Sequence, residues 1–183
     1  MSLNVTQGTD INDFRGGNRP PPGRYHVLVR NVEEVTARST GNPGFEFELE
    51  VLAGTVPGQE GKSFKHTAWN TSKSQDQLIS MAIATGILVP GKPANEGGEC
   101  EPEDLLSTEH AQLVVDIEED TYTDKNGQEK KTIKVAYGGI WPVGHKDVAH
   151  LKINQAAYDL WKSGNAPATA AANNNGDDSY GDL

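Results

Sequence analysis

The chain has little of what several protein classes require. It contains a single cysteine, Cys100, which excludes an intramolecular disulfide and a zinc site built on several cysteines. No stretch approaches the ~20 consecutive apolar residues of a membrane-spanning helix, and the first thirty residues lack the basic start and apolar run of a secretory signal. We therefore expect a cytoplasmic protein without a membrane partner.

The motifs of common enzyme classes are also missing. There is no Gly-Lys-Ser/Thr phosphate loop and no Gly-x-Ser-x-Gly elbow, and the five histidines are scattered without the spacing of a metal triad. The segment TDKNGQ resembles a calcium loop, but aligning Gly127 with the loop glycine puts Tyr122 at the first ligand position and Ile133 at the last. We expect a protein that is not an enzyme and needs no metal or cofactor.

Basic residues are fewer than acidic ones, 16 against 26, so the net charge is −10. This argues at first against a nucleic-acid partner, but the excess lies in one window, because residues 93–120 hold ten carboxylates and no Lys or Arg. The rest of the chain is balanced and has locally basic stretches at 15–38, 62–73 and 125–152. Since such fields are screened within ~8 to 10 Å at physiological salt, a local basic groove is compatible with an acidic chain.

Alternating apolar residues predict five strands, at 24–37, 45–54, 62–69, 111–124 and 130–141. The first strand loses its alternation near Asn31 and Val32, as a bulge or bend would cause. In the second, Phe45, Phe47, Leu49 and Val51 face inward and Glu46, Glu48 and Glu50 face outward. In the third, Lys65, Thr67 and Trp69 share one face and Phe64, His66 and Ala68 the other. Asn126-Gly127 predicts a hairpin between the last two strands.

The period changes to that of a helix at two places. One helix is expected over 71–86, with Ser72 and Gln75 in capping-box spacing and Gly86 at its end. A second helix is expected over 147–164. An acidic linker is expected over about 90–107, an N-terminal arm over 1–22, and a disordered acidic tail over 164–183.

The order of three strands, a helix and two strands is that of the five-stranded OB fold, a Greek-key barrel. We therefore predict a mainly β chain with an OB-type domain at 23–163 and a C-terminal helix at its end. An open sandwich of the same strands is the alternative.

The segment 20–140 resembles an uncharacterised family of phage and prophage proteins, proposed to bind single-stranded DNA in replication and recombination modules. The similarity rests on Gly23 and Tyr25 at the start of the first strand, Thr40 to Asn42 in the next turn, the phenylalanine-rich second strand, Gly58 and Gly61, and Ala84 to Gly86. The last residues are similar to the acidic, hydrophobic-ended tips of single-stranded-DNA-binding proteins. The resemblance implies that the protein is located in the cytoplasm of a bacterial host.

Binding of a single strand needs cations for the phosphates and aromatic faces for the bases. The candidate residues lie on the first, third and fifth strands and in adjoining loops: Arg30, Arg38, Lys62, Lys65, Trp69, Lys73, Lys131 and Lys134. For Trp69 two readings stay open, a stacking platform or a core residue. Phe45, Phe47, Tyr137 and Tyr158 are assigned to the core, and Trp141 is left undecided.

The leading hypothesis is a single-stranded-DNA-binding protein that recruits replication or recombination proteins through its tail. The tail residues that would bind a partner are Asp177, Asp178, Tyr180, Asp182 and Leu183. The alternative is an OB-fold adaptor or virion component that binds protein and no nucleic acid, which the net acidity and the three outward glutamates favour. The sequence leaves open whether the protein forms a homo-oligomer.

Overall fold

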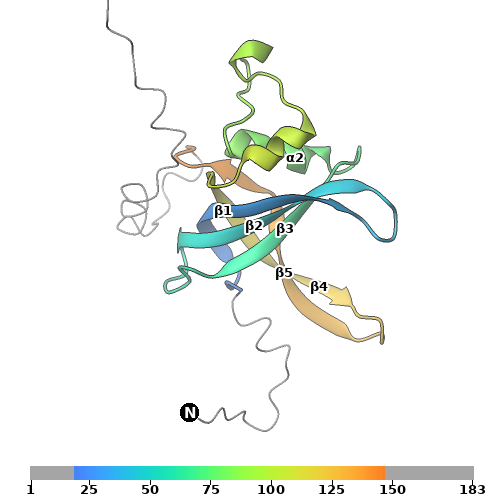
Figure 1. Ribbon diagram of the computed structural model, residues 1–183. Helices are drawn as coiled ribbons and strands as arrows, with labels where there is room; N and C mark the ends of the chain where they lie inside the picture. The colour runs from blue at the N-terminus through green and yellow to red at the C-terminus, as the bar shows by residue number, and fades with distance from the viewer. Residues whose placement is uncertain (1–18, 147–183) are drawn as a thin grey trace, which may run out of the picture.

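The computed structural model describes residues 19–146, and this part of the chain is mainly β (Figure 1). Five antiparallel strands form one sheet in the order β3-β2-β1-β4-β5. Their bounds are Gly23–Thr36 (β1), Pro43–Gly54 (β2), Ser63–Trp69 (β3), Gln112–Thr123 (β4) and Glu129–Pro142 (β5). Helix α2, Gln75–Ala84, lies between β3 and β4 and is followed by the 3-10 helices η1, Ala94–Glu96, and η2, Pro102–Ser107.

The predicted OB-type order of elements is confirmed, but the sheet is not closed. Within residues 19–146, β3 and β5 are the two outer strands of the sheet order, so each pairs with one neighbour only. The β1–β2 and β4–β5 hairpins extend toward the same side of the molecule (Figure 1). The fold is therefore a curled five-stranded sheet with an opening between β3 and β5.

Strand β1 lies at the centre of the sheet. It pairs with β2 from Tyr25 to Thr36 and with β4 from Gly23 to Leu28. The β1–β2 register shifts between Val29 and Asn31, so Arg30 is the extra residue of a bulge. This confirms the bend expected near Asn31, and a bulge of this kind increases the local twist that lets a sheet curl.

The core lies on the concave side of the sheet and is covered by α2 and η2 (Figure 1). Phe47 and Leu49 of β2 are fully buried, as are Val27 of β1 and Leu113 of β4. Burying each such side chain contributes roughly 1.5 to 3 kcal/mol. The outward glutamates of β2 are half-buried, so the predicted two-faced pattern of this strand is confirmed, including the core assignment of Phe45 and Phe47.

The core assignment of Tyr137 is wrong, because its side chain is 70% exposed. The β4–β5 register shifts between Val115 and Ile117, so that Ala136 to Gly139 stand opposite a single residue of β4. This large bulge turns Tyr137 away from the core. The Tyr137 hydroxyl donates a hydrogen bond to Asp76 Oδ2 on α2 at 3.1 Å. The fourth residue assigned to the core, Tyr158, lies outside the described residues, as does the helix expected over 147–164.

The helix α2 is present, but its predicted capping box is not. The N-cap is Ser74, whose Oγ donates to the carbonyl of Trp69 at 2.8 Å instead of capping the helix. The end at Gly86 is confirmed, because this residue has a φ of +83° directly after the C-cap Thr85. The expected acidic linker is wrong in part, since η2 folds there and its Leu105 is 1% exposed against the core.

We predict that protonation of His66 destabilises the fold. Burial lowers the pKa of His66 to about 4, and its Nε2 has no hydrogen-bond partner among the described residues. The ordinary pKa is about 6.5, so the unfolded state binds more protons between these values. The free energy of unfolding should fall as the pH drops below about 6.5, by up to roughly 3 kcal/mol at pH 4.

Urea denaturation at pH 5.0 and 6.5 measures this effect. Replacing the imidazole by an apolar side chain in His66→Leu should reduce the difference in unfolding free energy between the two pH values. An unchanged difference would show that His66 does not titrate in this range.

Candidate nucleic-acid interface

The outer face of β2 and β3, which points away from the core, carries alternating residues of both strands. Trp69 belongs to this face and is half-buried. Its cross-strand neighbour is Gly44, where a Cβ atom would lie only 2.6 Å from Cε3 of the indole. Trp69 therefore packs over Gly44 on the outer face. Of the two interpretations, a stacking platform or a core residue, the structure excludes the core position.

The cations of this outer face are held by glutamates of β2. Lys65 pairs with Glu46, and Arg30 pairs with Glu50 through two contacts, one of them between Nη2 and Oε1 at 3.0 Å. The hydrogen bond to Glu46 raises the pKa of Lys65, and the hydrogen bond to Glu50 raises the pKa of Arg30. Both cations are charged but partly neutralised, so the glutamates compete with any phosphate.

The two candidate lysines of β5 are paired in the same way across the β4–β5 hairpin. Lys131 Nζ lies 2.9 Å from Glu119, and Lys134 Nζ lies 3.2 Å from Asp120 and 3.6 Å from Glu118. Hydrogen bonds to Glu119 and to Asp120 raise the pKa values of Lys131 and Lys134, respectively. These ion pairs join strands β4 and β5 and are exposed to solvent.

Three candidate cations form no ion pair with any residue of the described range: Arg38, Lys62 and Lys73. Arg38 lies in the turn after β1 and Lys73 lies two residues before α2, and both are exposed. Lys62 precedes β3 and is half-buried. Their charges are therefore available to an anionic ligand without breaking an existing pair.

The opening between β3 and β5 is hollowed. Two adjoining hollows of about 340 and 540 Å³ share Arg19, Thr132 and Ile133 as lining residues. Their charged lining consists of Arg19, Lys62, Lys65 and Lys131 against Glu48 and Glu119. Four cations thus meet two carboxylates here, and the opening is the cationic part of the predicted surface.

The structure brings together only some of the candidate residues. Lys62, Lys65 and Lys131 line the opening, whereas Arg30, Arg38, Lys73 and Lys134 do not. The tail residues Asp177, Asp178, Tyr180, Asp182 and Leu183 lie outside the described residues.

The sequence reasoning missed Arg19. This residue comes from the segment before β1, and its Nη1 donates to Thr132 Oγ1 of β5 at 3.2 Å. The sequence indicates this role through the position of Arg19 directly before the proline run of residues 20–22. A stiff proline segment at the start of a strand holds a neighbouring charged side chain in place.

A second missed feature is a cluster around Trp141, which sequence analysis left undecided. The guanidinium of Arg24 lies 4.4 Å from the centre of this indole and also contacts the carboxylate of Asp116, with Nη2 to Oδ2 at 2.6 Å. Stacking of a cation on a half-buried indole stabilises the pairing of β1, β4 and β5. Trp141 therefore has a structural contact and is a weaker candidate for base stacking than Trp69.

Two further features were sought among residues 19–146, a metal-ligating cluster and a membrane-spanning helix. Residues 19–146 contain no group of three or more His, Cys, Asp or Glu side chains placed to hold a metal ion. No helix of this range is long and apolar enough to cross a membrane.

Comparisons with known proteins give a family and a distant structural likeness. The search of curated proteins found no match. A solved structure, "Yeast RPA bound to ssDNA", is similar to this chain with 10% sequence identity and a TM-score of 0.35, covering 88% of this chain and 99% of that chain. The family described as "Protein of unknown function (DUF669)" matches residues 7–134. Since this match covers more than half of the sequence, the chain belongs to that family.

Proposed function

We propose that this protein binds single-stranded DNA, with the strand running along β3. The observation that carries the proposal is the grouping of Arg19, Lys62, Lys65 and Lys131 at the β3–β5 opening. Trp69 lies at the other end of β3 on the outer face. Cations that track a backbone and an aromatic face on which any base can stack are the two requirements for binding without sequence preference.

The dimensions of β3 suit an extended strand of nucleotides. Lys65 and Trp69 lie on the same face of the strand, four residues apart, which is roughly 13 Å at the rise of a β-strand. A phosphate at Lys65 and a base on Trp69 would therefore lie about two nucleotide steps apart along an extended chain. Arg38 and Lys73, which have no ion pair within residues 19–146, flank the Trp69 end of β3 in sequence and in strand pairing.

The biological setting that we propose is replication or recombination of a phage or prophage. It rests on the resemblance of residues 20–140 to a phage and prophage family and on the acidic residues Asp177, Asp178 and Asp182. In this proposal the tail binds replication or recombination enzymes through Tyr180 and Leu183. The aspartates of the tail compete with DNA for the cationic opening.

A second candidate function is that of an adaptor that binds protein through the outer face. It is favoured by the pairing of Lys65 and Arg30 with glutamates, because Glu33, Glu46, Glu48 and Glu50 outnumber these two cations on the β1–β2–β3 surface. Such a face would attract a basic protein surface more readily than DNA.

We predict that Trp69→Leu weakens binding of a fluorescein-labelled dT20 oligonucleotide by roughly 5- to 150-fold, because stacking on an aromatic side chain contributes ~1 to 3 kcal/mol per base. Fluorescence anisotropy at 20 mM salt measures the dissociation constant. The matched control is Tyr137→Leu, which removes an exposed aromatic side chain on β5 beside α2 and should leave the constant unchanged. Absence of any binding by the wild-type protein at micromolar concentration would refute DNA binding and favour the adaptor.

We predict that Lys62→Ala lowers the dependence of binding on salt. A lost phosphate contact should reduce the slope of log affinity against log salt by about 0.7, since each contact with a single strand releases that share of a counterion. Lys92→Ala is the matched control, because Lys92 pairs with Glu96 away from β3. Equal slopes for both variants would show that Lys62 does not contact a phosphate.

We predict that deleting residues 165–183 leaves the affinity for dT20 unchanged or raises it, because the deletion removes Asp177, Asp178 and Asp182 as competitors for the cations. The truncated protein should also lose the recruitment of partner enzymes, measured by pull-down from host lysate. Weaker DNA binding by the truncated protein, or loss of its folded circular-dichroism spectrum, would contradict this role of the tail.

A further inference from the structure

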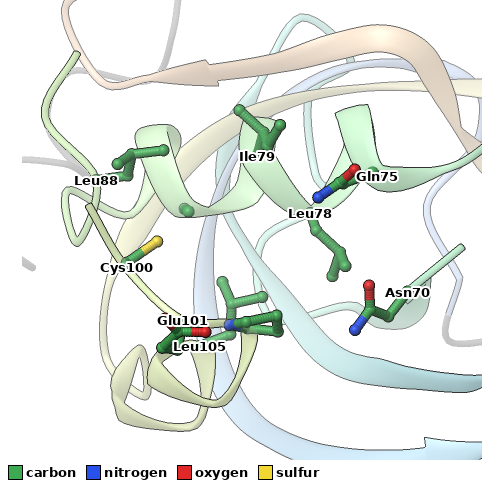
Figure 2. A pocket seen from close by; sticks show the side chains of 10 residues that line it. Asn70, Gln75, Leu78, Ile79, Leu88, Cys100, Glu101 and Leu105 are labelled. Atoms are coloured by element: carbon green, nitrogen blue, oxygen red, sulfur yellow. The ribbon is translucent and has the colours of Figure 1, made fainter. Parts of the chain in front are cut away.

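A cavity of about 320 Å³ lies between α2 and η2 and is separate from the hollows at the β3–β5 opening. Its walls are mainly apolar and are formed by Leu78, Ile79 and Ala82 of α2, Leu88, and Leu105 of η2. Figure 2 shows Leu78 pointing from α2 into the cavity, with Leu105 and Glu101 on the opposite side. Since an apolar cavity of ~150 Å³ admits benzene, this one has room for roughly two bulky apolar side chains.

Exposed apolar residues lie on the segments of chain that form the cavity. Ile79 is 41% exposed. Val89, which follows Leu88, is 38% exposed, and Leu106, which follows Leu105, is 43% exposed. Three of the five large exposed hydrophobic residues within 19–146 therefore belong to the segments that form this cavity. Exposed apolar side chains on the segments that form one cavity favour an interaction site there.

The surroundings of the cavity are acidic. Glu101 lines it, and Glu99, Glu103 and Asp104 lie on the same segment of chain, which contains no Lys or Arg between Pro93 and Asp120. Two cations lie close to the lining residues in sequence: Lys92, which pairs with Glu96 at 3.3 Å, and Lys73, two residues before Gln75. The carboxylates on the η2 side outnumber these two cations, so the charge favours a cationic occupant over nucleic acid or anionic lipid.

We propose that the α2–η2 cavity binds an amphipathic helical segment of a partner protein, with two apolar side chains one turn apart in the cavity and flanking Lys or Arg side chains on the surrounding carboxylates. Recognition of a helix in a groove uses anchors at positions i and i+3 or i+4, which matches the two-side-chain capacity of the cavity. The site does not require DNA binding, and its charge is opposite to that of the β3–β5 opening.

Cys100 provides a local measurement, because it is the single cysteine of the chain and lines the cavity. The probe is a 14-residue helical peptide with leucines at i, i+3, i+7 and i+10 and lysines elsewhere. The comparison peptide has glutamates in place of the lysines. At saturation the lysine peptide should slow alkylation of Cys100 by N-ethylmaleimide at least tenfold, and the glutamate peptide should not.

Variants test whether the peptide binds at this place. Ile79→Gln and Leu88→Gln should each weaken the lysine peptide at least tenfold by fluorescence anisotropy, and Glu101→Gln should weaken it about threefold with a smaller dependence on salt. Glu129→Gln, which removes one exposed carboxylate on β5, is the matched control and should have no effect. An unchanged circular-dichroism spectrum would show that the variants are folded.

Three results would overturn the proposal. The first is that the lysine peptide fails to protect Cys100. The second is that Glu129→Gln weakens the peptide as much as Glu101→Gln, which would mean unspecific attraction to an acidic protein. The third is that deleting residues 165–183 accelerates alkylation of Cys100, which would identify the tail of the chain itself as the occupant.

Discussion

The pairing of β1 with two neighbours is the interaction on which the rest of the structure depends. Its first half pairs with both β2 and β4, whereas its second half, beyond the bulge at Arg30, pairs with β2 alone. The bulge lets the sheet curl, so that the apolar faces of β1, β2 and β4 enclose one core under α2. The same curl brings β3 and β5 near each other without pairing them, and the opening between them follows from this geometry.

The opening is formed by the edges of β3 and β5, and strand edges leave backbone groups and side chains available to a ligand. Arg19, just before β1, reaches β5 there and joins lysines from the start of β3 and from β5. Cross-strand carboxylates pair with two of these cations, Lys65 with Glu46 and Lys131 with Glu119. The grouping of four cations at the opening, and not the total charge of the chain, therefore supports DNA binding as the proposed function.

The proposed DNA surface along β3 and the α2–η2 cavity have opposite charge and are joined by two consecutive residues. Trp69 lies on the outer face of β3, and the next residue, Asn70, lines the α2–η2 cavity. The hydrogen bond from Ser74 to the Trp69 carbonyl fixes the start of α2 to the end of β3. In our proposals a strand of DNA and a basic partner segment would occupy neighbouring but separate sites, so binding of one would not block the other.

The sequence by itself determined the strands, the two faces of β2, the helix between β3 and β4 and its end at Gly86, because alternation and chain reversal are local properties of the backbone. Only the tertiary structure decided which cations are neutralised, since Lys65 and Glu46 become neighbours through the register of two strands. It also decided the exposure of Tyr137, which depends on a bulge of β5 against β4, and the position of Arg19 across the opening. These features arise from contacts between residues far apart in the chain, and a periodic pattern within one segment contains no information about them.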